Sequence, residues 1–177
     1  IDPKLGPIFY LLDPNEEPAK PLHFQRDNSC LSCHGGPFTP EVPGVIVRSV
    51  YPGPEGHPIM SQGSTVVDTT TPFSDRWGGW YVTGRHGSVL HRGNVTATEK
   101  NDQTIDIDFK AGANVTDLAK VFDVTPYKRK QSDIVALMVL EHQTSVQNIL
   151  TKANQTSLRA MHMQTSLQRE LGETVQS

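Results

Sequence analysis

The sequence is poor in several features that identify a class of protein directly. With only two cysteines in 177 residues, it excludes a framework of several disulfides and a four-cysteine metal site. Aromatic residues make up 7% of the chain and hydrophobic residues 36%, which is little material for a core. No run of about 18 apolar residues occurs, so no membrane-spanning helix is predicted. A net charge of −3 argues against a general nucleic-acid or anionic-membrane binder.

Both cysteines stand in one short motif, Cys30-Leu31-Ser32-Cys33-His34. The spacing C-x-x-C-H is typical of c-type haem attachment, in which the two thiols bond to the haem and the histidine ligates the iron from the proximal side. The motif therefore predicts haem c bound by Cys30, Cys33 and His34. Side chains packed on a large apolar cofactor would also bury area that the chain itself has little of.

Two other interpretations of the cysteine pair remain open. A redox dithiol usually begins a helix after a buried strand, and residues 21–29 do not resemble such a strand. A zinc site would need two more ligands. Six further histidines could supply them: His23, His57, His86, His91, His142 and His162.

The distribution of apolar residues predicts an α+β fold with a small antiparallel sheet, a short haem-bearing helix and a long C-terminal helix. Residues 8–12 read as a strand, and 104–109 as an edge strand or linker. Residues 45–51 with 57–60, and 77–84 with 89–92, predict two antiparallel hairpins. We expect residues 1–112 to form the haem-binding α+β domain and residues 113–177 a helical segment.

The long helix is predicted from Asp133 to Leu171, with Ser132 as its cap and Gly172 as its terminator. One side of this helix carries an apolar stripe with near-helical spacing. Its members are Ile134, Met138, His142, Val146, Ile149, Ala153, Ala160, Met163, Leu167 and Leu171. At about 1.5 Å per residue the helix would be roughly 58 Å long, more than a small domain can cover. We expect its distal half to contact redox protein partners, a second copy in a homo-oligomer, or other parts of a longer parent chain.

The distal ligand of the iron has several candidates. His142 is the first, because it lies on the apolar stripe and should face whatever the helix covers. His86, in a glycine-flanked turn, is the second, and His91 is the third. The helix methionines more often serve in packing, and an open distal site is the remaining alternative.

Further side chains are candidate haem contacts. Arg76 and Arg85 could pair with the haem propionates, since guanidinium groups match carboxylates in a bidentate way. The aromatic side chains of Trp77 and Trp80, together with Tyr81, could form a wall of the haem site or could pack on a sheet face.

The motif is accompanied by no pattern of nucleophile and base, so electron transfer with six-coordinate iron is the main functional hypothesis. The alternatives are a haem-based sensor or interaction module with an open or exchangeable distal site, and peroxidase-like chemistry there. Because haem c is attached outside the bacterial cytoplasm, we expect a periplasmic or extracellular bacterial protein. The chain starts at Ile1 without a signal peptide, which suggests a processed chain or a fragment.

Several segments together resemble an uncharacterised family of bacterial extracytoplasmic single-haem cytochrome-c-like proteins. They are residues 2–6, 9–10, 30–35, 42–44, 48–52, 76–84, 86–87, 93–94 and 140–143. The resemblance covers most of residues 1–155 and implies a longer parent chain. Residue by residue, it implies haem attachment by Cys30 and Cys33 and proximal ligation by His34. It implies no reaction.

Overall fold

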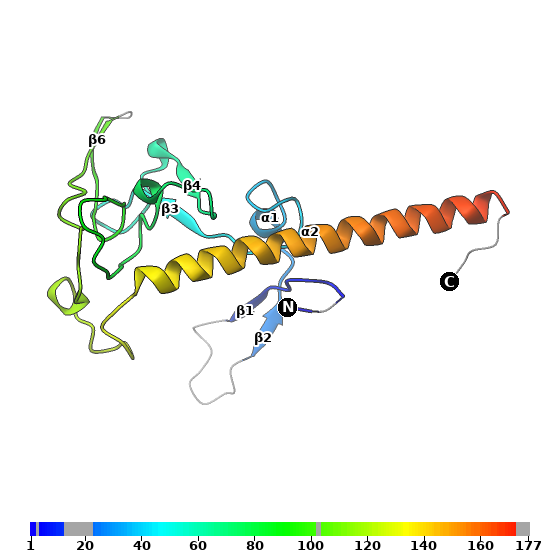
Figure 1. The fold of residues 1–177 in the computed structure, drawn as a ribbon, viewed down its shortest axis with the longest axis horizontal. Coiled ribbons are helices and arrows are strands. Elements are labelled where there is room, and N and C mark those ends of the chain that lie inside the picture. Colours follow the sequence, from blue (N-terminus) through cyan, green and yellow to red (C-terminus); the bar gives the residue numbers. More distant parts are fainter. Residues whose placement is uncertain (3, 13–22, 102–103, 173–177) are drawn as a thin grey trace. The chain divides into compact units, whose positions relative to one another are not determined.

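The structure is a computed structural model that describes residues 1–2, 4–12, 23–101 and 104–172. The predicted α+β class is confirmed, with small antiparallel sheets of two strands each and one long C-terminal helix (Figure 1). In the described part of the chain β1 (Tyr10–Leu12) pairs with β2 (Phe24–Arg26), β3 (Arg48–Val50) with β4 (Ser64–Val66), and β5 (Thr98–Asn101) with β6 (Thr104–Asp106). The helices are α1 (Leu31–His34) and α2 (Ile134–Glu170), and the 3-10 turns are η1 (Met60–Gln62), η2 (Phe73–Asp75) and η3 (Leu118–Lys120).

The chain divides into two compact units. The first, unit 1, consists of Ile1–Val45 and Val146–Ser177, and the second, unit 2, of Ile46–Ser145. Helix α2 contributes residues to both. The C-x-x-C-H motif belongs to unit 1. The predicted boundary between residues 112 and 113 stays a prediction.

The strand predictions were partly right. Strands β1, β3 and β6 lie inside the segments predicted at 8–12, 45–51 and 104–109. The predicted hairpin of 77–84 with 89–92 is wrong, because neither segment contains a strand in the structure. The backbone turns at Trp77, with φ +64°, and at Gly79, with φ +85°, so an extended run cannot form there.

The prediction of the long helix is confirmed to within one residue at each end. Its N-cap is Asp133 rather than Ser132, because Oδ1 of Asp133 accepts a hydrogen bond from the N–H of Ala136 at 2.9 Å. Gly172 has φ +71°, the left-handed conformation that a glycine commonly adopts just after a helix.

The covered face of α2 differs from the predicted one. Its buried positions are Ile134, Glu141, Thr144, Asn148 and Thr151, and four of these five side chains are polar. Of the predicted apolar stripe Ile134 is buried, but Met138, Val146 and Ile149 are 41%, 39% and 60% exposed. His142 is exposed as well, so the expectation that its side of the helix faces the covered surface is wrong. Two of the buried polar side chains have hydrogen bonds to residues outside α2, Glu141 with Trp77 and Asn148 with Val45, which apolar periodicity does not predict.

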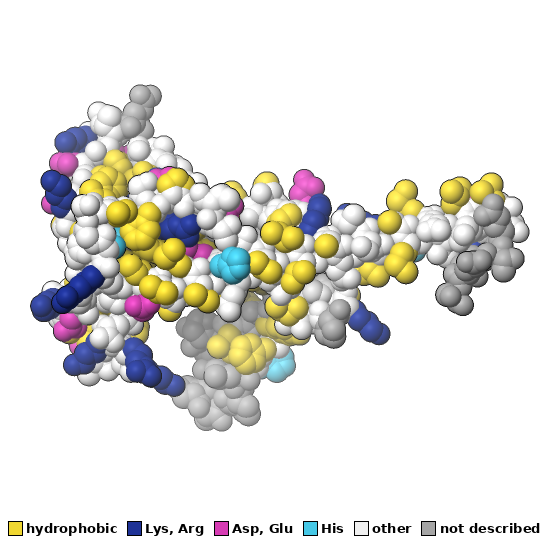
Figure 2. Space-filling view, viewed as in Figure 1, with side chains coloured by type: hydrophobic (Ala, Val, Ile, Leu, Met, Phe, Trp, Pro, Cys, Tyr) yellow, Lys and Arg dark blue, Asp and Glu magenta, His cyan; other side chains and the backbone are white. Residues whose placement is uncertain are grey.

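The distal half of α2 exposes the side chains that were expected to need a partner. Met163 and Leu167 are 71% and 56% exposed, and Leu171, just after the end of α2, is 63% exposed. Figure 2 shows hydrophobic side chains, in yellow, along this part of the helix. Among the helices that the structure describes, none is long and apolar enough to cross a membrane.

The core of unit 2 is built around Trp77, Val82 and Ile134. Glu141 is buried next to Trp77. Its carboxylate accepts a hydrogen bond from Nε1 of Trp77 at 2.7 Å and forms an ion pair with the guanidinium of Arg76. The guanidinium of Arg76 also donates to the carbonyl of Thr71 at 2.7 Å. A buried ion pair of this kind is tolerated because every polar atom has a partner.

Candidate functional site

The C-x-x-C-H residues form the short helix α1. Cys30 is its N-cap residue, and the N–H of His34 donates to the carbonyl of Cys30 at 2.9 Å. Residues three and four positions apart lie on one side of a helical turn, so this turn places Cys33 and His34 on the same side as Cys30. Cys33 is exposed and Cys30 is half-buried, and both are free thiols. This arrangement leaves the two sulfurs accessible for thioether formation.

Gly44 binds His34 through two hydrogen bonds. The N–H of Gly44 donates to the carbonyl of His34 at 2.8 Å, and Nδ1 of His34 lies 3.0 Å from the carbonyl oxygen of Gly44. A carbonyl can only accept, so Nδ1 of the neutral ring carries the proton and Nε2 carries a lone pair. In the described part of the chain, Nδ1 is the only nitrogen of the His34 ring that makes a hydrogen bond. Iron-ligating histidines are held in this way, with the other ring N–H on a backbone carbonyl.

Gly44 has no room for a side chain. A Cβ atom at this position would lie 2.6 Å from Oδ1 of Asn148 and 2.9 Å from Cγ2 of Thr39. The buried hydroxyl of Thr39 in turn lies 2.8 Å from the carbonyl of Val42 and 3.1 Å from that of Gly36. The loop that follows the haem motif is therefore fixed by close packing around a glycine.

One aromatic ring of unit 1 packs against His34. The ring of Phe9 lies against the imidazole of His34, with 4.6 Å between the ring centroids. Unit 1 also exposes several large apolar side chains, among them Tyr10, Phe24 and Phe38. Three features together fit the chemistry of haem c. They are two accessible thiols, an imidazole whose Nε2 lone pair points away from Gly44, and exposed apolar side chains. Cys30, Cys33 and His34 are the residues that would hold it.

The zinc alternative has no supporting geometry in the described residues. No three His, Cys, Asp or Glu side chains come together there in a group that could hold a metal ion. A structural zinc site needs four such ligands.

His86 and His91 form a hydrogen-bonded pair in unit 2. Their Nε2 atoms are 3.1 Å apart, Nδ1 of His91 accepts from the N–H of Gly93 at 3.0 Å, and Nδ1 of His86 lies 2.6 Å from the carbonyl of Val89. The N–H of Asn114 donates to Nε2 of His86 at 2.8 Å. Because Nδ1 of His91 accepts from Gly93, Nε2 of His91 carries the proton and donates to Nε2 of His86, whose single lone pair is shared with the N–H of Asn114.

This pairing bears on the predicted distal ligands. Burial lowers the pKa of His91 to about 4, with a smaller contribution from the repulsion that would arise if His86 and His91 were both protonated, so the His91 ring is neutral near pH 7. Ligation through Nε2 of His86 would cost the hydrogen bond from Asn114. His142, the first candidate, is exposed on α2. His86, His91 and His142 belong to unit 2 and His34 to unit 1, and distal ligation stays a prediction.

The remaining predicted contact residues also lie in unit 2. Arg76 and Trp77 are buried and hold the carboxylate of Glu141, as described above. Nε1 of Trp80 donates to the carbonyl of Arg48 at 2.9 Å, and Arg85 is exposed. Contacts of these four side chains with a haem stay predictions.

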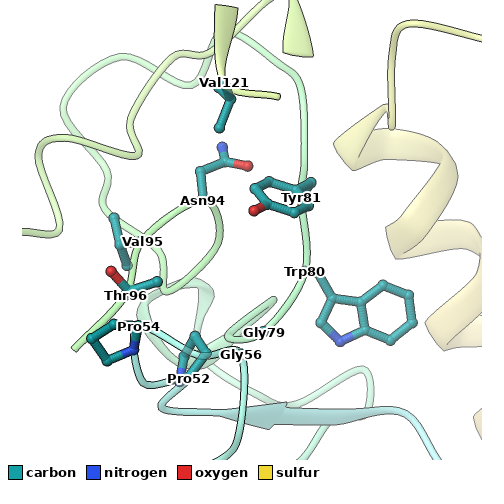
Figure 3. A pocket seen from close by; sticks show the side chains of 10 residues that line it. All are labelled: Pro52, Pro54, Gly56, Gly79, Trp80, Tyr81, Asn94, Val95, Thr96 and Val121. Carbon is teal, nitrogen blue, oxygen red and sulfur yellow. The ribbon is translucent and has the colours of Figure 1, made fainter. Parts of the chain in front are cut away.

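A pocket of about 350 Å³ lies in unit 2, lined mainly by proline, glycine and aromatic residues (Figure 3). The ring of Tyr81 points into it, whereas the indole of Trp80 turns away. The amide of Asn94 already serves the fold, since it accepts from the N–H of Val82 at 2.7 Å and donates to the carbonyl of Gly112 at 3.0 Å. No cysteine or histidine lines this pocket.

Sequence reasoning missed the residues that orient His34. The carbonyl of Gly44, the ring of Phe9 and the side chain of Asn148 were not predicted as parts of the site. The only local signal was the turn Val42-Pro43-Gly44, in which a glycine follows a proline shortly after the motif. Asn148 lies more than a hundred residues further along the chain, so no spacing rule points to it.

Comparison with protein families, with curated proteins and with solved structures gave no match. The resemblance to single-haem cytochrome-c-like proteins therefore stays a prediction from the sequence.

Proposed function

We propose that this protein is a c-type cytochrome that carries one covalently attached haem and transfers electrons. The observation that carries the proposal is the state of His34. Its Nδ1–H is held by the carbonyl of Gly44, which leaves the lone pair of Nε2 for a metal, on the same helical turn as two free thiols. A haem supplies one-electron redox chemistry when it is bound.

The roles of the chain's own residues follow from this geometry. Cys30 and Cys33 provide the sulfur atoms for two thioether bonds. His34 provides the proximal ligand, and its hydrogen bond to Gly44 fixes the tautomer and the direction of the ring. Phe9 packs against the imidazole and keeps water from one side of it.

Covalent attachment is tested by producing the chain in a bacterial periplasm that attaches haem to C-x-x-C-H motifs. After denaturing electrophoresis, the wild-type band should stain for haem peroxidase activity. The double variant Cys30→Ala, Cys33→Ala should give a band of equal protein but no stain. A wild-type band without stain rejects the proposal, and zinc found in that protein by elemental analysis would favour the metal-site interpretation.

Electron transfer is separated from sensing by the absorption spectrum of the haem-loaded chain in both redox states. A carrier with two protein ligands should be low-spin and should not bind carbon monoxide rapidly. A high-spin spectrum with rapid carbon monoxide binding would instead identify a sensor or an interaction module with an exchangeable distal site.

The expected assembly with redox partners or a second copy is likewise a proposal. It is supported by the exposed apolar side chains on the distal half of α2, such as Leu158, Met163 and Leu167. Light scattering on the purified chain tests it. A monodisperse monomer at all concentrations contradicts self-association, and a mass that rises with concentration supports it.

A further inference from the structure

Asn148 is a polar residue in the middle of α2 whose side chain is only 8% exposed. A buried amide is costly unless its donor and acceptor atoms are both satisfied. In Asn148 both kinds of atom form hydrogen bonds to Val45, in the loop that follows the C-x-x-C-H motif. Oδ1 accepts from the N–H of Val45 at 2.9 Å, and Nδ2 donates to the carbonyl of Val45 at 2.8 Å.

The N–H of Val45 and the carbonyl of Gly44 belong to the same planar peptide unit. The carbonyl end of that unit accepts from Nδ1 of His34, and its N–H end donates to Asn148. A hydrogen-bonded chain therefore runs from the imidazole through one rigid peptide to the amide on α2. Hydrogen bonds in such a chain polarise and strengthen one another.

Asn148 can approach this peptide only because residue 44 is a glycine. A Cβ there would lie 2.6 Å from Oδ1 of Asn148, well inside a normal contact distance. Residues 1–45 and 146–177 belong to the same compact unit, so the contact joins elements that are placed together.

We infer that Asn148 is a positioning residue for the proximal ligand: by fixing the Gly44–Val45 peptide it sets the tautomer and the direction of His34. This inference rests on the proposed function for its consequence at the iron, but the positioning itself exists without haem. Loss of the Asn148 side chain frees the peptide to rotate, and the imidazole then loses a directed acceptor for Nδ1–H.

The test uses the full chain with Asn148→Ala, and with Asn154→Ala as a matched control, because Asn154 is an exposed asparagine on the same helix. Two properties are measured without haem: amide hydrogen exchange at Val45, and the tautomer of His34 by long-range proton–nitrogen NMR. Asn148→Ala should speed exchange at Val45 at least about tenfold and shift His34 from the Nδ1–H form toward a mixture, while Asn154→Ala leaves both at wild-type values.

A second variant covers the case in which Asn148→Ala does not fold. Asn148→Leu has a similar size but offers neither the acceptor for the N–H of Val45 nor the donor to its carbonyl, so it should move both properties in the same direction. The indole N–H signal of Trp77 reports whether the rest of the chain is intact. The inference is overturned if folded Asn148 variants keep the wild-type tautomer of His34, even if exchange at Val45 is faster.

The haem-loaded chain gives an independent measurement. A hydrogen bond from Nδ1 makes the imidazole a stronger donor to iron, which favours the oxidised state. Asn148→Ala should therefore raise the midpoint potential relative to Asn154→Ala, and equal potentials overturn the inference. A wild-type chain that takes up no haem rejects the proposed function alone, because the tautomer and exchange measurements still decide the role of Asn148.

Discussion

The imidazole rings of His34 in unit 1 and His91 in unit 2 carry their proton on opposite nitrogen atoms. Nδ1 of His34 faces a carbonyl, so it carries the proton and Nε2 has a lone pair to offer. Nδ1 of His91 faces the N–H of Gly93, so it must accept, and Nε2 carries the proton and donates to His86. The backbone group beside Nδ1 thus decides whether a histidine can ligate a metal through Nε2.

The two regions also differ in what holds the ring. His34 is held by a peptide that is fixed by Gly44 and Asn148, whereas His91 is enclosed by side chains. The indole of Trp77 packs edge-on against His91 with 5.2 Å between centroids, and Trp77 is itself tied to the buried pair of Arg76 and Glu141. Unit 2 should therefore be more sensitive to loss of a charge, and the His34 region more sensitive to added volume.

The largest effect is expected from Arg76→Ala, which leaves the buried carboxylate of Glu141 without its cation. The free energy of unfolding should fall by about 3–5 kcal/mol, measured by urea denaturation with tryptophan fluorescence. Arg85→Ala is the control, since Arg85 is exposed, and it should stay within about 0.5 kcal/mol of wild type. Equal effects of the two substitutions would show that the ion pair does not stabilise unit 2.

The next effect is a loss of stability in acid caused by His91. The pKa of His91 is about 4 in the folded chain and 6.5 in its ordinary state, so the unfolded chain binds more protons between these values. Stability is full above pH 6.5 and falls by about 2–3 kcal/mol as the pH drops to 4. His91→Phe should flatten this part of the curve of unfolding free energy against pH.

The control for that curve is His57→Gln, because His57 is exposed. It should keep the wild-type slope between pH 6.5 and 4. A His91→Phe curve as steep as that of wild type would mean that the slope comes from other groups.

A smaller loss is expected from Gly44→Ala, which tests the packing around His34. The added methyl group would press on Asn148 and Thr39, and the unfolding free energy should fall by about 1–3 kcal/mol. Gly53→Ala is the matched control, because a Cβ at Gly53 would meet its neighbours at ordinary distances of 3.5 Å and more. If both substitutions lower the free energy of unfolding equally, the close contacts at Gly44 do not destabilise an alanine there.

The smallest effect is expected from Thr39→Val, which removes one buried hydroxyl from the loop after the haem motif. Loss of its hydrogen bonds to the carbonyls of Val42 and Gly36 should cost about 1 kcal/mol of unfolding free energy. Thr98→Val, at an exposed strand position, should cost nothing measurable or stabilise slightly. A stabilising Thr39→Val would show that the loop does not need this hydroxyl.

Much of the fold was predictable where one local rule was sufficient. The ends of α2 were predicted to within one residue, and Gly172 ends it as expected, although its N-cap is Asp133 and not Ser132. The strand expected at residues 77–84 failed because Trp77 adopts a positive φ, which no propensity rule anticipates for a tryptophan. The buried face of α2 was misassigned because Asn148 is buried to satisfy a distant backbone peptide.

The candidate site was predictable only in part for the same reason. Cys30, Cys33 and His34 follow from one motif. The partner that sets the tautomer of His34 comes from a backbone carbonyl, which carries no sequence signal. The proton on His91 is likewise set by the backbone N–H of Gly93. Sequence therefore names the candidate ligands, and three-dimensional structure decides which of their nitrogens is available.

The most direct test of this account is a long-range proton–nitrogen NMR spectrum of the chain with labelled histidines at a pH above 7. Nδ1 should be protonated and Nε2 unprotonated in His34, and the reverse should hold in His91. His34 protonated on Nε2, or a free mixture of tautomers at His34, would contradict the claim that the fold prepares this ring to ligate iron.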